Sequence, residues 1–425
     1  MPSTPEKLIV NQLGAGGDGL VRFADGTHGF VPFTLAGEHI VARRVARRGD
    51  GWLAEAEAVE QASPERIRPA CPHFGPCGGC ALQHWAPAPA AIWKRARLVE
   101  ALARAGYPDV PVADTITSPP GSRRRADLAI RRQDGAIRLG LHERIDPKVI
   151  VDIADACPIL APRLENLLAP LKEMLRRLTG LRKEGSAVLN LLDSGPDLLL
   201  RTDAELTVPD RQILARFGTD HGLPRIAWAK GEGPSEPAAQ NGEVRHMLSG
   251  HAVTPAPGAF MQATPQGEAA IIEAVLAGLP KKLSGRARIA DLYAGMGTLS
   301  FPLAQRGRVT AIEGEAHAVA ALQAASGATR ISAERRDLAR RPLAPAELKD
   351  FAAVVVDPPY AGAAEQIALL ARSTVPAIVY VSCNPAALSR DAKMLQAASW
   401  KAVSAVPIDQ FPWSSHLESV VAFTR

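Results

Sequence analysis

The sequence predicts a multidomain α/β protein that begins with a small β-barrel and ends with a doubly wound, mostly parallel sheet. Its 425 residues correspond to about three domains of ordinary size. Short apolar segments separated by glycine turns fill the first part of the chain, whereas apolar strands alternate with helical segments from about residue 260. With 47% hydrophobic and 22% charged residues, the composition is that of a globular chain and excludes wholesale disorder.

The sequence gives no sign of a membrane protein or a secreted one. It contains no run of about 18 apolar residues, and its first residues lack a basic segment followed by an apolar core. We therefore expect a cytoplasmic protein whose cysteines stay reduced. The net charge of +5 is small for this length, so it permits a nucleic-acid partner without requiring one.

The N-terminal part predicts a small β-barrel of the OB type. The apolar segments are KLIVNQL, GLVRF, HGFVPF, EHIVARRV and WLAEAEAV, and turn sequences such as GAGGDG and RRGDG separate them. Several short strands at close spacing favour such a barrel, although the same pattern fits any other small β-module.

The middle of the chain predicts a mixed α and β structure. A helical stretch, AIWKRARLVEALARAG, ends at Gly106, and a second helix is expected over residues 163–178. Between them, RADLAIRR and AIRLGLHER flank a QDG turn as in a β-hairpin. The turn-rich segment 230–243 predicts an exposed loop before the last region.

Four of the five cysteines have the spacing of metal ligands. Cys71, Cys77 and Cys80 form a C-x5-C-x2-C run, and Cys157 follows at a distance. Four thiolates suit either zinc or an iron–sulfur cluster. Three bunched ligands with a distant fourth are closer to a four-iron cluster than to paired zinc knuckles, but zinc and free thiols remain open on spacing alone.

A strand, a glycine turn and a helix follow one another in RIADLYAGMGTLSFPLA. Asp291, Gly295 and Gly297 stand at the strand's carboxyl end, where backbone can approach a ligand, and Glu313 ends the next strand, where an acid can accept from ribose hydroxyls. Since G-x-G-x-x-G is absent, S-adenosylmethionine fits better than a dinucleotide. Asp337, after the next strand, is a further candidate for contact with the adenine. An ordinary strand–helix turn and a solvated surface acid are the alternatives.

Asp357 ends another apolar strand and is followed by Pro358, Pro359 and Tyr360. The prolines remove backbone donors and stiffen the loop beside the expected methyl donor. A strand ending in D-P-P-Y is also typical of methyltransferases that act on exocyclic amines of nucleic-acid bases. There the aspartate accepts from the amine and the aromatic ring stacks on an extruded base.

Cys383 and Glu418 are candidates for a nucleophile and a base. Cys383 follows a strand and precedes Asn384 and Pro385, so its sulfur can project into the same crevice; a buried, inert cysteine is the alternative. Glu418, preceded by His416, enters the last apolar strand, where a raised pKa would suit a general base and an edge-strand glutamate is the alternative.

Chemistry explains why a cysteine and an acid would be needed together. C5 of a pyrimidine accepts a methyl group only after a thiolate has added to C6. A base must then remove the C5 proton so that the cysteine can leave. Methylation of an exocyclic amine needs neither group.

Together these motifs resemble the RNA (uracil-5-)-methyltransferase family. In order they are CPHFGPCGGCALQHW, SRRRADLAI, VDIADACPIL, GAFMQATPQ, DLYAGMG, DPP, SCNP and FPWSSHLE, and they span nearly the whole chain. The resemblance implies three domains: a TRAM-like OB-type β-barrel over 1–62, a central RNA-binding α+β domain with an iron–sulfur cluster over 63–255, and a Rossmann-like class I methyltransferase domain over 256–425.

The resemblance also implies roles for single residues. Cys383 matches the nucleophile and Glu418 the base. Two departures stand out, because Tyr360 follows D-P-P where the family commonly has arginine and Thr298 replaces an asparagine of the cofactor turn. The ligands implied for a [4Fe-4S] cluster are Cys71, Cys77, Cys80 and Cys157. The positions that match contacts with S-adenosylmethionine or the target are Gln262, Tyr293, Glu313 and Asp357.

The expected activity is S-adenosylmethionine-dependent C5-methylation of a uridine in structured RNA, by a protein acting as a monomer. The barrel and the cluster together make the chain more similar to the 23S rRNA enzymes than to the tRNA members, which usually lack both. A tRNA uridine methyltransferase and an exocyclic-amine methyltransferase are the alternatives.

Basic residues crowd around the expected hairpin and predict a phosphate-binding face, with a solvated charged surface as the alternative. Phe260, Tyr360 and Trp413 are candidates for stacking on an extruded base, and core packing is the alternative for each. The basic residues are Arg123, Arg124, Arg125, Arg131, Arg132, Arg138, Arg144 and Lys148.

Overall fold

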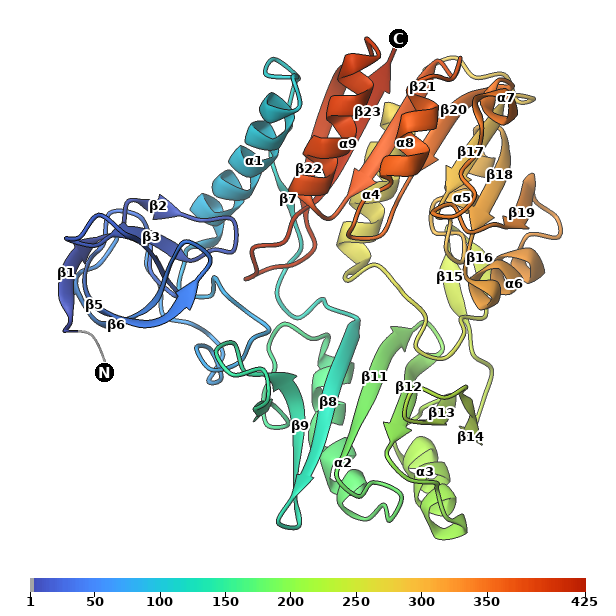
Figure 1. Ribbon diagram of the computed structural model, residues 1–425. Helices are drawn as coiled ribbons and strands as arrows, with labels where there is room; N and C mark the ends of the chain where they lie inside the picture. Colours follow the sequence, from blue (N-terminus) through green and yellow to red (C-terminus); the bar gives the residue numbers. More distant parts are fainter. Residues whose placement is uncertain (1–3) are drawn as a thin grey trace.

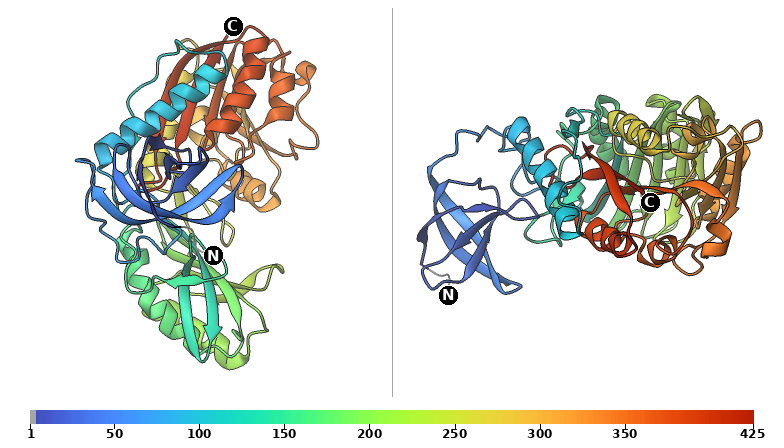
Figure 2. Two further views of the ribbon diagram at one scale, coloured as in Figure 1. Left: turned by 60° about the vertical axis from the view of Figure 1, so that its left-hand side comes forward. Right: turned by 90° about the horizontal axis from the view of Figure 1, so that it is seen from above.

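The computed structural model describes residues 4–425 and contains three large sheets (Figure 1). The N-terminal sheet has six strands, the central sheet seven and the C-terminal sheet eight. The right-hand view of Figure 2 shows the N-terminal sheet at one side of the molecule, with the first helix between it and the C-terminal part. No helix within residues 4–425 combines the length and apolarity needed to cross a membrane.

The N-terminal sheet curls into a barrel-like shape, as its short glycine-separated strands predict (Figure 1). Its strand order is β1-β5-β6-β4-β3-β2. A small core fills it, built from side chains such as Val10, Val21, Phe23 and Ile40. The strands are β1 (Glu6–Ile9), β2 (Gln12–Leu13), β3 (Gly19–Arg22), β4 (His28–Val31), β5 (His39–Arg48) and β6 (Gly51–Gln61).

The segment after the cysteine run joins the C-terminal sheet. Helix α1 (Pro87–Arg104) packs against α9 (Pro385–Ala397) and β22 (Lys401–Asp409), and β7 (Ile116–Thr117) pairs in parallel with β22. Leu98 and Leu102 of α1 lie in the same core cluster as the C-terminal strands. The predicted domain boundaries group this segment with 63–255, whereas its contacts tie it to the last part of the chain.

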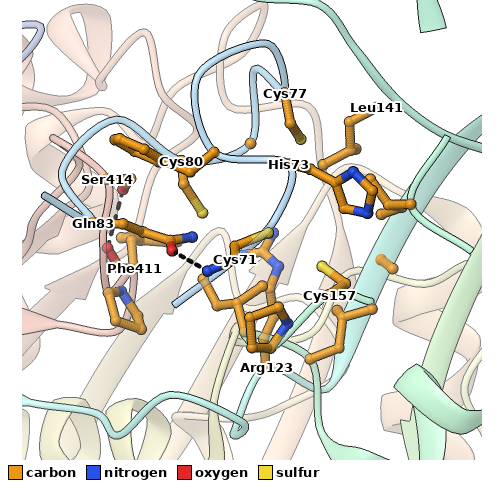
Figure 3. Close-up of a pocket in the computed structure, with 18 of the residues that line it drawn as sticks. Cys71, His73, Cys77, Cys80, Gln83, Arg123, Leu141, Cys157, Phe411 and Ser414 are labelled. Carbon is orange, nitrogen blue, oxygen red and sulfur yellow. Dashed lines mark hydrogen bonds between the residues drawn. The ribbon is translucent and has the colours of Figure 1, made fainter. Parts of the chain in front are cut away.

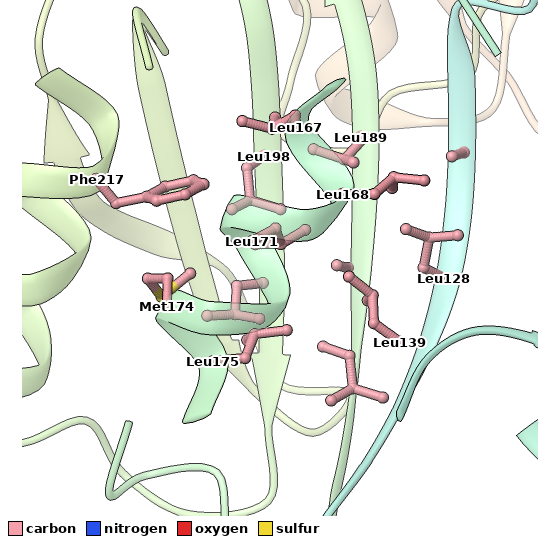
Figure 4. Close-up of a cluster of buried hydrophobic side chains, with 14 of the residues drawn as sticks. Leu128, Leu139, Leu167, Leu168, Leu171, Met174, Leu175, Leu189, Leu198 and Phe217 are labelled. Atoms are coloured by element: carbon pink, nitrogen blue, oxygen red, sulfur yellow. The ribbon is translucent and has the colours of Figure 1, made fainter. Parts of the chain in front are cut away.

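The central sheet has the order β10-β9-β8-β11-β12-β13-β14, and helix α2 covers one face of it through leucines shown in Figure 4. The predicted hairpin is confirmed: β8 and β9 pair antiparallel around Asp134 and Gly135, both at positive φ. The predicted loop over 230–243 instead contains an edge strand, β14. The elements are β8 (Arg125–Gln133), β9 (Ala136–His142), β10 (Ile150–Asp152), α2 (Pro162–Arg176), β11 (Glu184–Leu192), β12 (Gly195–Thr202), α3 (Val208–Asp220), β13 (Arg225–Lys230) and β14 (Glu236–Gln240).

The C-terminal sheet is doubly wound, as predicted, and has the order β19-β18-β17-β20-β21-β23-β22-β7. The strands β19, β18, β17, β20 and β21 are parallel, and β23 runs antiparallel between β21 and β22. The strands are β17 (Arg288–Leu292), β18 (Arg308–Glu313), β19 (Ile331–Arg335), β20 (Phe351–Val356), β21 (Ala377–Ser382) and β23 (Glu418–Thr424).

Helices flank this sheet, and several begin at residues that cap backbone N–H groups. Thr264 accepts from Gly267 N–H before α4, and Asn384 accepts from Ala386 N–H before α9, each with a proline at the start of the helix. A two-stranded hairpin precedes the sheet. The remaining elements are β15 (His246–Leu248), β16 (His251–Val253), α4 (Pro265–Gly278), α5 (Ser300–Ala304), α6 (Ala316–Ala325), α7 (Pro345–Leu348) and α8 (Ala364–Leu370).

Candidate active site

A cavity of about 790 Å³ opens at the carboxyl ends of β17, β18 and β20. Because β17 lies in the middle of the parallel strands, this is the edge of the sheet where doubly wound folds bind ligands. We call it the strand-end cavity. The sequence-predicted catalytic and cofactor residues that line it are Gln262, Asp291, Tyr293, Gly295, Glu313, Asp357, Cys383 and Glu418.

The glycine turn after β17 has a backbone that requires its glycines. Gly295 and Gly297 both lie at positive φ. A Cβ on Gly297 would stand 2.6 Å from a methyl carbon of Leu322, whereas a Cβ on Gly295 would meet nothing within 4 Å. Gly297 therefore allows α6 to pack closely against the turn, and Gly295 leaves open space at the cavity wall.

Two acids hold this turn in place. Glu313, at the end of β18, accepts from Gly295 N–H at 2.9 Å and from Glu315 N–H at 2.8 Å. Asp291 is wholly buried, and its Oδ2 accepts from the Ser300 hydroxyl at 2.5 Å, whereas its Oδ1 has no partner among residues 4–425. Burial, together with the charges of Asp357 and Glu313, raises the pKa of Asp291 to about 7.

Asp357 follows β20 and leads into the proline pair. Its N–H donates to Leu292 O at 3.2 Å, which ties it to the end of β17. Burial raises the pKa of Asp357 well above its ordinary value. Tyr360, two residues beyond the first proline, keeps 59% of its surface exposed and lines the same cavity.

The register of two antiparallel strands brings Cys383 to Glu418. Ser382 of β21 pairs with Ser419 of β23, so the next position along each strand places Cys383 opposite Glu418. Burial, together with the carboxylates of Glu418 and Asp357, raises the pKa of the Cys383 thiol to about 12. Glu418 does not lie in an edge strand, because β23 is enclosed by β21 and β22.

Glu418 is 5% exposed, and burial together with the nearby Asp357 raises its pKa well above the ordinary value. It pairs with Ile408 of β22 in the sheet. Two residues farther along the loop, Gln410 donates to its carboxylate at 3.0 Å. Gln410 lines the cavity but is not among the site residues predicted from the sequence. The only local signal was its place in the segment that leads from one strand into FPWSSHLE.

Asp337 is the one predicted cofactor contact that does not line the strand-end cavity. It is exposed, accepts from Ala339 and Arg340 N–H groups in its own turn, and forms an ion pair with Arg340. Its backbone lies beside Gly314, just beyond Glu313.

The basic residues predicted to form one phosphate-binding face are divided among several structural contacts. Arg124 is buried and pairs with Glu268 at 2.5 Å, Arg144 pairs with Asp18 at 2.6 Å, and Arg132 donates to carbonyls at the end of α2. Arg123 and Arg125 instead line the strand-end cavity. The expected face is therefore reduced, because ion pairs and carbonyl contacts use several of its guanidinium groups.

The three residues predicted to stack on an extruded base do not all lie at the strand-end cavity. Phe260 is 69% exposed and lines the strand-end cavity together with Tyr360. Trp413 is not among the residues of that cavity, and its carbonyl accepts from the Ala81 and Leu82 N–H groups at 2.8 and 2.9 Å. This contact ties the loop before Glu418 to the chain just after Cys80.

A second cavity, of about 430 Å³, is lined by all four cysteines of the predicted cluster. Figure 3 shows their side chains around one space, three from the loop before α1 and Cys157 from the loop after β10. We call it the cysteine cavity. It reaches the active-site region, because Cys383, Tyr360 and His416 line it too.

The surroundings of these cysteines are compact and thiol-rich. A Cβ on Gly78 would stand 2.7 Å from His142 O, and one on Gly79 would stand 2.6 Å from Leu141, so only glycines allow this loop to approach β9. Burial, together with the neighbouring thiols, raises the pKa of Cys80 to about 11 and that of Cys157 to about 12.

All five cysteines are free thiols. Within residues 4–425, no three His, Cys, Asp or Glu side chains are already gathered as ligands of one metal ion.

A third hollow, of about 1140 Å³, runs between the barrel, α1 and Cys383, and we call it the helix groove. The barrel contributes its loop at Gly14–Gly16, α1 contributes Trp93 and Arg97, and the far end is formed by Tyr360 and Cys383. Arg97 lies 4.9 Å from the Trp93 ring and donates to Ser415 O. Cys383 and Tyr360 therefore stand where all three cavities meet.

The chain is similar in sequence to known RNA methyltransferases. Residues 258–425 match the family model described as tRNA (Uracil-5-)-methyltransferase. The chain is 38% identical to an uncharacterized RNA methyltransferase of Caulobacter vibrioides, over 99% of this chain and 100% of that one. It is 34% identical to the 23S rRNA (uracil(1939)-C(5))-methyltransferase RlmD of Halomonas elongata, over 98% of this chain and 88% of that one.

The fold also matches a solved structure. The Pyrococcus abyssi tRNA (uracil-54, C5)-methyltransferase, in complex with S-adenosyl-L-homocysteine, superposes with a TM-score of 0.74. The match covers 99% of this chain and 100% of that chain at 24% identity. At this identity the likeness establishes the fold.

Proposed function

Because the chain belongs to the RNA (uracil-5-)-methyltransferase family, we propose that it methylates C5 of a uridine in 23S rRNA, with S-adenosylmethionine as the methyl donor. The observation that carries this proposal is the meeting of Cys383 and Glu418, opposite each other in register, in the cavity formed by the strand ends. The 23S rRNA assignment is supported by the Halomonas relative.

The strand-end cavity suits S-adenosylmethionine. Its acids Asp291, Glu313 and Asp357 face a space where a cationic sulfonium would offset their repulsion, and Asp291 Oδ1 is a buried acceptor that lacks a partner within residues 4–425. Gly295 leaves the wall open for a ligand. Thr298, which replaces the family's asparagine, lines the cavity as well. When bound, the cofactor supplies the methyl group.

The side chains of the chain divide the reaction between them. The Cys383 thiolate adds to C6 of the uracil, and the electron pair displaced from the C5–C6 bond makes C5 nucleophilic. C5 then takes the methyl group. Glu418 removes the remaining C5 proton, the C5–C6 double bond re-forms, and the C6–S bond breaks to release Cys383.

We further propose that Cys71, Cys77, Cys80 and Cys157 hold a [4Fe-4S] cluster. The support is chemical: four free thiols from two loops share one cavity. Burial and the repulsion among the thiolates raise the pKa of Cys80 and Cys157, and bound iron reverses such a shift. Arg123 lies close enough to Cys157 and Cys80 to favour their anionic forms. The cluster would supply no step of the methylation.

We propose that RNA reaches the active site through the helix groove, which Cys383 lines. A structured RNA lying along α1 would present an extruded base to Cys383, where Tyr360 and Phe260 are exposed for stacking. We also propose that the protein acts as a monomer. We accordingly propose a barrel that assists RNA binding, a central domain, and a catalytic domain that also includes α1.

The deciding experiment is nucleoside mass spectrometry of rRNA and tRNA after incubation with the protein and S-adenosylmethionine. We expect 5-methyluridine in 23S rRNA. If 5-methyluridine forms only in tRNA, the protein is a tRNA uridine methyltransferase instead. N-methylated nucleosides, formed equally by Cys383→Ala, would replace the proposal with an exocyclic-amine methyltransferase.

A further inference from the structure

Gln410 joins two predicted site residues through a fully buried amide. Its side chain is 1% exposed, and its Nε2 lies 2.7 Å from Gln262 Oε1 and 3.0 Å from Glu418 Oε2. Its Oε1 accepts from Ala263 N–H at 2.9 Å. One amide thus connects the segment before α4 to the first residue of β23.

The orientation of this amide is determined by its partners. Ala263 N–H can only donate, so it must face the oxygen of Gln410. The two N–H groups of Gln410 therefore face the Glu418 carboxylate and Gln262 Oε1, and both are used. Since Gln262 accepts with its oxygen, its own amide nitrogen points the other way.

The backbone around Gln410 is held from several sides. Asp409 accepts from Lys94 at 2.6 Å and from Phe411 N–H at 3.0 Å, and its carbonyl accepts from Ser118 N–H at 2.9 Å. A Cβ on Gly267 would stand 2.5 Å from Gln410 Cβ, so the first turn of α4 packs directly against it. These contacts together fix Gln410 in place.

The groups around Glu418 mostly oppose its ionisation. Burial and the charge of Asp357 raise its pKa, and the hydrogen bond from Gln410 lowers it. The Cys383 thiol faces Glu418 from β21, and Asp291 faces Asp357 from β17. The buried cation Lys94 is paired with Asp409. Of the groups that shift the pKa of Glu418, Gln410 is the one that favours the carboxylate.

We propose that Gln410 is a positioning residue for the methylation: its amide fixes one oxygen of Glu418, favours the ionised form of that carboxylate, and orients Gln262 on the other side. This inference rests on the proposed function, in which Glu418 removes the C5 proton. It predicts that Gln410 acts on breakdown of the Cys383–RNA adduct more than on methyl transfer, because only breakdown needs the base.

The test compares Gln410→Met with Gln366→Met in single-turnover reactions over a range of pH. Gln366 is a matched control: it is fully buried, accepts from Leu343 N–H at 2.8 Å and donates to Leu343 O at 3.2 Å, and lies outside all three cavities. The rates of methyl transfer and adduct breakdown are measured separately by denaturing electrophoresis and nucleoside analysis.

We expect Gln410→Met to slow adduct breakdown and to move the pH dependence of that step about 1 pH unit to the alkaline side, because a donor to a charged group is lost. Methyl transfer should change less, and Gln366→Met should leave the pH profile unchanged. Gln410→Asn, which keeps a shorter amide, should give a smaller shift in the same direction.

Equal slowing at every pH in both Gln410 variants would overturn the proposal and assign Gln410 a purely structural role. A shift of the same size in Gln366→Met would overturn it too, and so would wild-type profiles in the Gln410 variants. If Gln410→Met does not fold, the profile of Gln410→Asn decides. Absence of 5-methyluridine with the wild-type protein would instead contradict the proposed function, so the two failures are distinguishable.

Discussion

Lys94 and Asp409 form a buried ion pair that joins helix α1 to the strand leading into the active-site loop. Lys94 Nζ lies 2.6 Å from Asp409 Oδ1, and the Lys94 side chain is 1% exposed. The same ammonium donates to Phe411 O at 3.2 Å. A helix that precedes the central sheet in sequence thus helps to hold Gln410 and the loop before Glu418.

Lys94→Met should destabilise the protein by about 3 kcal/mol, because it leaves the Asp409 carboxylate buried without its partner. Adding Asp409→Asn should recover part of this loss. Urea unfolding measures both variants. The control is Lys172→Met, which removes a more exposed pair with Asp152 and should cost about 1 kcal/mol or less. Equal losses in the two lysine variants would contradict the prediction.

Cys383→Ala and Glu418→Gln should fail at different stages. Without the thiol, no covalent adduct and no product should form with RNA that contains uracil or 5-fluorouracil. With glutamine at position 418, the adduct should form and persist because the C5 proton is not removed. Denaturing electrophoresis of labelled RNA measures both. Adduct formation by Cys383→Ala would refute the assignment of the nucleophile.

Adduct formation should accelerate as pH rises. The pKa of Cys383 is raised to about 12, so the thiolate fraction grows with each step from about pH 7 to about pH 9. Glu418 also has a raised pKa and needs to lose its proton to act as a base, so adduct breakdown should accelerate over the same pH range. Initial rates with saturating S-adenosylmethionine should rise over this range, and a rate that falls with pH would contradict the prediction.

Stability without ligand should fall as pH rises from about 4 to about 7. Asp291 has a pKa raised from 3.8 to about 7, so in this window the folded state binds more protons than the unfolded state. The expected slope is at most about 1.4 kcal/mol per pH unit for this group. Asp291→Asn should flatten the curve of unfolding free energy against pH. An unchanged slope in that variant would show that Asp291 does not cause the loss of stability with rising pH.

Replacing a proposed cluster ligand and replacing Cys383 should have different effects on the iron content of the protein. Cys157→Ala should lose the iron, the acid-labile sulfide and the broad visible absorption expected of anaerobically purified protein. Cys383→Ala should keep all three, because Cys383 stands outside the proposed ligand set. Colourless wild-type protein with stoichiometric zinc would refute the cluster. Loss of iron in Cys383→Ala would refute the assignment of four cysteines as cluster ligands and of Cys383 as the nucleophile alone.

Local patterns were enough to find most of the candidate site. Asp291, Glu313, Asp357 and Cys383 each follow or end an apolar strand, and parallel strands bring their carboxyl ends to one edge of the sheet. The hairpin around Gly135 was equally local, because its turn residues favour positive φ. The strand β14 was missed because edge pairing with β13 outweighs the turn-rich composition of its sequence.

Strand-end acids, a lone cysteine and grouped cysteines can be recognised along the chain, so the side chains available for the chemistry were predictable from their local patterns. How these side chains meet depends on long-range packing. The register of β21 against β23 sets Cys383 opposite Glu418, and ion pairs with Glu268 and Asp18 withdraw Arg124 and Arg144 from the expected basic face. The role proposed for Gln410 also depends on long-range packing. Its hydrogen-bond partner Gln262 is far from it in sequence, and no local pattern predicts that contact.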